Sequence, residues 1–227
     1  MTSPAGRAGW SAELWSTSTS TYAAILVHPF LAGLTSGDLS VEAFAYYVAQ
    51  DAHYLRDFAR ALSVVGAKAP SHEATGMFAR HSAGTVVVER ALHDRLLSEL
   101  GLDPDVVSRT PVSPTTTAYT SYLLATCHGG SFAEGLAAVL PCYWIYAEVG
   151  QALLARGSPD PRYQRWIETY GGAEFAASVV EVLDLADQVG SVISPVERSQ
   201  ANAHYRVTSR YEWMFWDAAW RREGWPL

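Results

Sequence analysis

The segment SVEAFAYYVAQDAHYLRDFARALSVV, residues 40–65, decides the fold class. Apolar side chains recur in it at intervals of three and four residues, which is the spacing of one face of an α-helix. Ser40 has the residue type of an N-cap, and Glu42 places a negative charge in the first turn. The segment is therefore predicted to be a long helix with one buried face, made of Phe44, Tyr47, Val48, Asp51, Tyr54, Leu55, Phe58 and Leu62.

One charged residue, Asp51, interrupts this apolar face. A carboxylate costs free energy in such a position unless it is paired or takes part in chemistry. Two interpretations stay open at this point. Asp51 lies at a partly exposed edge of the stripe, or it is a functional group.

The same spacing extends to the rest of the chain, with breaks at glycine and proline. No segment shows the alternation of a strand or the turn of a hairpin. We therefore predict a single-domain, all-α helical bundle over residues 1–227, with about seven or eight helices joined by short loops. The further helices are expected at residues 9–32, 71–100, 115–128, 131–156, 163–172, 173–189 and 194–223, with a loop at 101–114.

Composition and charge exclude several classes of protein. The chain has 16 Lys and Arg against 23 Asp and Glu, a net charge of −7, which argues against a nucleic-acid partner. The sequence contains no charge-free apolar stretch of about 18 residues, so we predict no membrane span. No secretory signal is apparent. Two cysteines, Cys127 and Cys142, do not form a disulfide framework. We expect a cytoplasmic protein.

A second stretch, LPCYWIYAEVGQAL at residues 140–153, contains Cys142 and, one helical turn later, Tyr146. Residues four apart share a helix face, so the thiol and the phenol point into the same space. Pro141 precedes the cysteine and is expected to kink the helix. A lone cysteine on an apolar helix is usually a small buried hydrophobe, so spacing alone does not establish a reactive thiol.

Motifs for other chemistries are missing from the sequence. A di-iron bundle needs Glu-x-x-His, whereas Glu89 and His93 are four residues apart, and no His pair or HExxH motif suggests zinc. No phosphate-binding loop or GxSxG motif occurs. The strongest candidates left are Cys142 as nucleophile and Asp51 and Glu212 as acid–base groups, with aromatic side chains as a binding cage.

Four segments together resemble the thiaminase II (TenA) family, relatives of coenzyme PQQ synthesis protein C. They follow the family's order and span most of the chain. The resemblance implies a haem-oxygenase-like helical fold and the branch of the family that keeps a cysteine. The segments are HPFLAGLTSGDLSVEAFAYYVAQDAHYL at 28–55, LPCYWIYAEVG at 140–150, YQRWIETYGG at 163–172 and SRYEWMFWDAAW at 209–220.

The resemblance implies four catalytic roles. Cys142 in PCYWIY matches the family's nucleophile, and Asp51 in QDAHYL matches the carboxylate that hydrogen-bonds an aminopyrimidine ring. Tyr54 matches the tyrosine that activates the thiol. Glu212 in YEWMFW matches the acid–base glutamate near the leaving group. Because Cys142 is predicted to lie in mid-helix, a helix dipole cannot activate it, and Tyr54 or Glu212 must do so.

The resemblance also implies substrate contacts by Tyr146, Tyr170 and, on a weaker motif, Tyr119. The implied reaction is hydrolysis of 4-amino-5-aminomethyl-2-methylpyrimidine, and of thiamin, to the hydroxymethylpyrimidine, in thiamin salvage. It implies no cofactor, a small-molecule pyrimidine as partner and a homotetramer. Trp220 and Trp225 fit a subunit contact or packing of the C-terminal tail.

Three questions stay open from sequence alone. The physiological substrate is thiamin or its degraded pyrimidines, since no motif marks the thiazole side of the pocket. A haem-oxygenase-like or PQQ-synthesis-like oxidase is an alternative, which a His or Arg cluster in place of Cys142, Asp51 and Glu212 would favour. A regulator that binds pyrimidine without turnover is the other alternative.

Overall fold

The computed structural model describes the backbone of residues 6–100 and 109–226, and their side chains except those of residues 88–100. Within these residues it contains ten helices and no strand, which confirms the all-α prediction. The helices are α1 (Trp10–Ser16), α2 (Thr19–Leu26), α3 (Pro29–Ser36), α4 (Val41–Ala67), α5 (His72–Leu100), α7 (Pro114–Gly129), α8 (Phe132–Leu154), α9 (Pro161–Gly171), α10 (Ala173–Gly190) and α11 (Pro195–Arg221).

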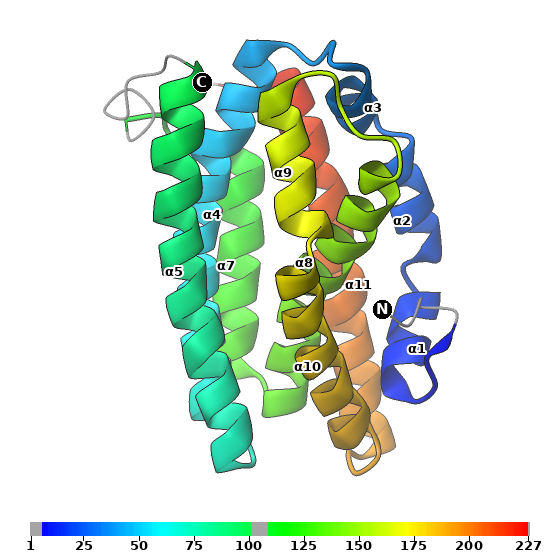
Figure 1. Cartoon of the computed structure of the whole chain (residues 1–227). Helices are drawn as coiled ribbons and strands as arrows, with labels where there is room; N and C mark the ends of the chain where they lie inside the picture. The colour runs from blue at the N-terminus through cyan, green and yellow to red at the C-terminus, as the bar shows by residue number, and fades with distance from the viewer. Residues whose placement is uncertain (1–5, 101–108, 227) are drawn as a thin grey trace.

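The long helices run along one direction of the molecule (Figure 1). Helix α8 is the central element, since it packs against α4, α7, α9, α10 and α11. Its sequence is apolar on almost every side, as expected of a helix surrounded by others. Helices α1 to α3 cover one flank of the bundle, and α5 lies at the opposite edge against α4 (Figure 1).

Helix α4 begins and ends close to the predicted bounds. The Ser40 side chain accepts a hydrogen bond from the Ala43 amide, which is the expected N-cap geometry. In α8, Ser131 and Glu134 form a reciprocal capping box. The helix continues through Pro141 to Leu154, so the proline does not end it.

The prediction of one helix over residues 9–32 is wrong, because the structure has three short helices there. Helix α1 ends where the hydroxyls of Thr17 and Ser18 donate to the Leu14 and Trp15 carbonyls. Such local bonds compete with the helical backbone. Helix α3 starts anew at Pro29, and His28 Nδ1 caps it by accepting from the Phe30 amide.

Other predictions fall outside the described residues. The expected break at Gly101 and Pro104 lies there, as do the side chains of Glu89 and His93. Among the described helices, none is long and apolar enough to cross a membrane.

Candidate active site

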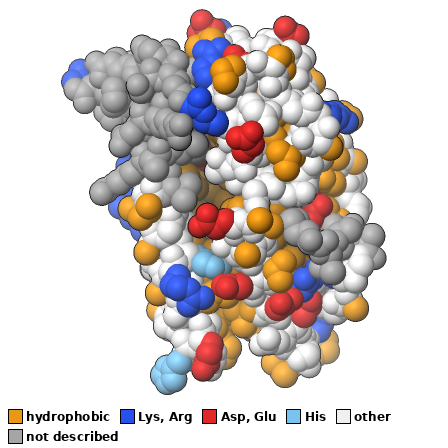
Figure 2. Space-filling view, in the orientation of Figure 1, with side chains coloured by type: hydrophobic (Ala, Val, Ile, Leu, Met, Phe, Trp, Pro, Cys, Tyr) orange, Lys and Arg blue, Asp and Glu red, His pale blue; other side chains and the backbone are white. Residues whose placement is uncertain are grey.

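A cavity of about 670 Å³ opens between the helices of one face of the bundle. This volume is typical of small-molecule sites, which span roughly 300–1,000 Å³. In Figure 2, carboxylate, basic and histidine side chains gather around a hollow on this face. The wall is built from α4 (Asp51, Tyr54, Leu55, Phe58), α5 (Arg80, His81, Gly84, Thr85), α8 (Cys142, Tyr143, Tyr146), α9 (Glu168, Thr169, Tyr170) and α10 with its preceding residue (Gly172, Ala173, Glu174, Phe175, Ser178, Glu181).

The two residue pairs predicted from helical spacing meet in this cavity. Asp51 and Tyr54 enter it from α4, and Cys142 and Tyr146 enter it from α8. All four side chains are almost fully buried, because the helices that carry them lie inside the bundle. The arrangement provides a thiol, a carboxyl group and two phenols around one space that can hold a planar ring.

The surroundings of Cys142 favour the protonated form of its thiol. Burial raises its pKa well above the ordinary value, and the nearby Glu212 carboxyl raises it further. The Tyr54 hydroxyl lies beside the sulfur and lowers that pKa, although it makes no hydrogen bond of ordinary geometry. The thiol therefore depends on its neighbours, rather than on a helix dipole, to lose its proton.

Glu212 on α11 is the strongest candidate acid–base group. Burial raises its pKa from 4.5 to about 8, and the Asp51 carboxyl contributes in the same direction. The Tyr119 hydroxyl on α7 donates a 2.5 Å hydrogen bond to Glu212 Oε1, which lowers that pKa. A group with a pKa near neutrality can both give and take a proton.

Glu212 and Tyr119 are both buried, and neither is among the described residues that line the cavity. The Tyr119 hydroxyl contacts Glu212, and the contact of Tyr119 with the substrate stays a prediction. The Tyr119 ring stacks on Tyr211 and lies against Tyr54.

Tyr146 and Tyr170 form an aromatic wall of the cavity. Their ring centroids lie 4.8 Å apart, at an angle of 52°. The hydroxyls of Tyr146 and Tyr47 are hydrogen-bonded over 3.2 Å. The Tyr47 ring in turn stacks on the Trp216 ring. Sequence analysis did not single out Tyr47 or Trp216 as support for this wall, because their roles depend on contacts between α4, α8 and α11.

A close crossing of α8 and α9 sets the position of Tyr170. The two backbones approach each other at Gly150 and Gly171. A Cβ atom on Gly150 would lie against the Tyr170 carbonyl and 2.5 Å from the Gly171 amide nitrogen. Backbone atoms cannot rotate away as a side chain can, so only glycine fits at this crossing.

We therefore expect Gly150→Ala to separate α8 from α9 and to lower the free energy of unfolding by roughly 1–3 kcal/mol. Tyr170 moves with α9, so affinity for a ring held in the cavity should fall as well. Denaturant unfolding and ligand titration measure the two effects. The matched control is Gly76→Ala in α5, where the new Cβ comes no nearer than 3.9 Å to an Arg80 side-chain nitrogen. It should be neutral or stabilising, and equal effects of both variants would contradict the argument.

Sequence analysis missed the part of the cavity that lies between α5 and α10. His81 and Glu181 line it together with Tyr143, which follows Cys142 in the chain. No motif marks these residues, since a histidine on a long helix is commonly a surface residue. One available signal was the helical spacing of His81 and Thr85, four residues apart on α5, which both face the cavity.

Two known proteins are similar to this chain over most of its length. An aminopyrimidine aminohydrolase of Bacillus subtilis (strain 168) is 40% identical over 199 residues, 88% of this chain and 84% of the relative. The solved structure of a TenA homologue from P. horikoshii OT3 superposes with a TM-score of 0.85 at 30% identity, covering 94% of this chain and 99% of that one.

The fold also matches a more distant structure. A domain with a heme oxygenase-like fold from Shewanella denitrificans OS217 superposes with a TM-score of 0.74 at 16% identity, covering 93% of this chain and 92% of that one. At that identity the likeness concerns the fold alone, and it confirms the predicted haem-oxygenase-like class. The model of the TENA/THI-4/PQQC family matches residues 15–222. The chain therefore belongs to the TENA/THI-4/PQQC family.

Proposed function

We propose that this protein is an aminopyrimidine aminohydrolase. It hydrolyses 4-amino-5-aminomethyl-2-methylpyrimidine, and thiamin, to 4-amino-5-hydroxymethyl-2-methylpyrimidine in thiamin salvage. The observation that carries the proposal is the meeting of Cys142 and Asp51 in one aromatic-walled cavity. The name of the Bacillus subtilis relative supports the same reaction class.

Recognition of the pyrimidine ring falls to Asp51 and the tyrosines. A carboxylate favours the cationic tautomer of an aminopyrimidine through charge-assisted hydrogen bonds. Such a ring is a better electrophile than the neutral form. Tyr146 and Tyr170 offer flat apolar faces for stacking, with hydroxyls at the edge.

The chemical steps use Cys142 and Glu212. The sulfur bonds to a ring carbon while the thiol proton passes to the Glu212 carboxylate, and Tyr54 assists this step. The ring electrons then expel the group on the exocyclic methylene. A neutral amine takes the proton from Glu212 as it leaves, whereas an ammonium or the thiazolium of thiamin leaves as ammonia or thiazole without one, and Glu212 then loses its proton to solvent. Water adds to the methylene and returns a proton to Glu212. The carbon–sulfur bond then breaks, and the thiol regains that proton.

We further propose that this protein is a single domain and that it works in the cytoplasm as a homotetramer without a cofactor. Exposed apolar side chains, among them Met214 and Trp220 on α11, support a subunit contact. Trp225 supports it less, since its indole N–H donates to the Val112 carbonyl of the same chain. Light scattering of the purified protein distinguishes a tetramer from a monomer.

The cavity wall disfavours the oxidase alternative. An oxidase of this kind would have a His or Arg cluster in place of Cys142 and Asp51. Here Arg80 and His81 lie instead on the separate wall formed by α5. Among the described residues, no group of three or more His, Cys, Asp and Glu is arranged to hold a metal ion. The regulator alternative is distinguished by turnover alone.

Product analysis tests the proposed function directly. The purified protein is incubated separately with thiamin and with 4-amino-5-aminomethyl-2-methylpyrimidine. We expect hydroxymethylpyrimidine from both, and the larger kcat/KM identifies the preferred substrate. Tight pyrimidine binding without any product would support the regulator instead.

A further inference from the structure

The cavity is larger than a pyrimidine ring requires, and it has two chemically different parts. The inner part contains Asp51, Cys142 and Tyr146. The outer part extends between α5 and α10, and Thr85 and Ser178 are among its polar side chains. If a ring is held by the inner groups, the outer part is the remaining volume of the cavity into which its exocyclic substituent can extend.

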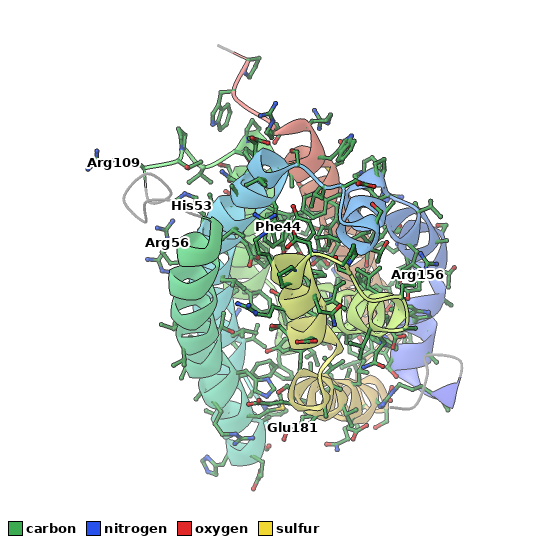
Figure 3. All side chains as sticks on the ribbon, turned by 45° about the horizontal axis from the view of Figure 1, so that its top comes forward. Phe44, His53, Arg56, Arg109, Arg156 and Glu181 are labelled. Atoms are coloured by element: carbon green, nitrogen blue, oxygen red, sulfur yellow. The ribbon has the colours of Figure 1, made fainter. Side chains whose placement is uncertain are left out.

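Three side chains of the outer part form a continuous chain of polar contacts. The Tyr143 hydroxyl lies 3.1 Å from His81 Nδ1, and His81 Nε2 lies 3.4 Å from Glu181 Oε2. Glu181 is on α10, and Figure 3, where it is labelled, shows it close to the gap between α10 and α5. Tyr143 and His81 are largely buried, whereas half of the Glu181 side chain is exposed.

The contacts favour one tautomer of His81. A carboxylate only accepts hydrogen bonds, so the 3.4 Å contact with Glu181 favours the tautomer in which His81 Nε2 carries the hydrogen. Burial lowers the pKa of His81, against the opposing effect of Glu181, so its imidazole is neutral near pH 7 and Nδ1 has a free lone pair. In that tautomer the Tyr143 hydroxyl donates to Nδ1. With its hydrogen committed to His81, the Tyr143 oxygen offers only lone pairs to the cavity.

We propose that Tyr143 accepts a hydrogen bond from the leaving group and that His81, oriented by Glu181, is the residue that positions the Tyr143 hydroxyl for this contact. The proposal rests on the proposed function and deepens it. It makes Tyr143 a specificity-determining residue, which favours amine leaving groups over the thiazolium of thiamin.

The chemistry of the two substrates supports this assignment. The aminomethyl group of the small pyrimidine is an ammonium near neutral pH, and it donates hydrogen bonds. The thiazolium nitrogen of thiamin bears three carbon substituents and has no hydrogen to donate. Carboxylates of Glu174 and Glu181 on α10 also line this part, which suits a compact cation. Arg80 lies at the rim, paired with Glu181 at 3.4 Å.

Tyr143→Phe tests the contact, because it removes the hydroxyl and keeps the ring. We expect kcat/KM for 4-amino-5-aminomethyl-2-methylpyrimidine to fall about tenfold or more, the usual effect of losing a hydrogen bond to a charged group. For thiamin it should change less than about threefold, since no such bond is lost. The matched control is Tyr122→Phe. Tyr122 makes a similar chain with His204 and Glu134 outside the cavity, so its loss should affect both substrates equally and little.

The positioning role of His81 needs separate variants. His81→Leu should reproduce the substrate-selective loss, and His81→Asn, whose side-chain oxygen can occupy the place of Nδ1, should restore much of it. In the Tyr143→Phe background, His81→Leu should add nothing, because His81 acts through that hydroxyl. If His81 were purely structural, His81→Leu would lower kcat/KM for both substrates further in the Tyr143→Phe background.

The outcomes separate this inference from the proposed function. If the wild type turns over neither substrate, the proposed function fails and the inference fails with it. If the wild type is active but Tyr143→Phe affects both substrates alike, only the inference is overturned. Glu181→Gln is a second variant that preserves folding, since the side chain is half exposed. It should show a smaller loss that is again selective for the amine, and an unselective loss would count against the proposal.

Discussion

Cys142→Ser is expected to abolish turnover of both pyrimidine substrates, with kcat lower by on the order of 10³-fold or more. A serine hydroxyl is a weaker nucleophile than a thiol and holds its proton more tightly. The burial that already raises the thiol pKa penalises an alkoxide more strongly. The substitution changes one atom, so folding and ring binding should be retained. Product formation by the variant and the wild type measures the loss.

The second cysteine provides the control for this experiment. Cys127 is also buried and has a pKa raised to about 12 by burial, but it lies on α7 and does not line the cavity. Cys127→Ala should therefore keep turnover within a few fold of wild type. Full activity of Cys142→Ser would eliminate the covalent mechanism. It would leave Asp51 and Glu212 to activate water directly.

Glu212→Gln is expected to have opposite effects on activity and stability. Loss of the acid–base group should lower kcat by roughly 10²–10⁴-fold. The folded state raises the pKa of this carboxyl from 4.5 to about 8, so it binds the proton more tightly than the unfolded chain does. Folding stability of the wild type therefore falls as pH rises from about 4.5 to about 8. Glutamine removes the ionisation and with it this loss.

The stability effect is measured as a difference between two pH values. The free energy of unfolding of Glu212→Gln, relative to that of the wild type, should be higher at pH 8 than at pH 5 by roughly 2–4 kcal/mol, at about 1.4 kcal/mol per pKa unit. Comparing two pH values cancels any fixed cost of the new amide. Glutamine also keeps an oxygen that accepts from Tyr119. Denaturant titrations at both pH values give the free energies of unfolding.

A carboxyl group with the opposite shift serves as control. The pKa of Asp160 is lowered, first by its hydrogen bonds from the Arg162 guanidinium. Asp160 is ionised at both pH values in the folded state and the guanidinium keeps its charge, so Asp160→Asn should cost nearly the same free energy at each. If the effect of Glu212→Gln on the free energy of unfolding does not change with pH, Glu212 is already ionised at pH 5. Its assignment as the acid–base group would then be wrong.

The sequence by itself determined the helix class and much of the inner site. Helical spacing depends only on neighbours along the chain, so the α4 stripe and its Ser40 cap were readable from it. The same spacing placed Asp51 with Tyr54, and Cys142 with Tyr146, on shared faces that the structure brings together. The resemblance to the TenA family predicted that these two pairs belong to one site.

Only the tertiary structure decided what surrounds these groups. The Tyr119–Glu212 hydrogen bond joins residues 93 positions apart, and the Tyr143–His81 contact joins residues 62 apart. No local pattern encodes such pairs, because they depend on how α5, α7, α8 and α11 pack. Burial decides the direction of the Glu212 and Cys142 pKa shifts for the same reason. Desolvation is a property of all the helices around a group, and the chain acquires it only when they assemble.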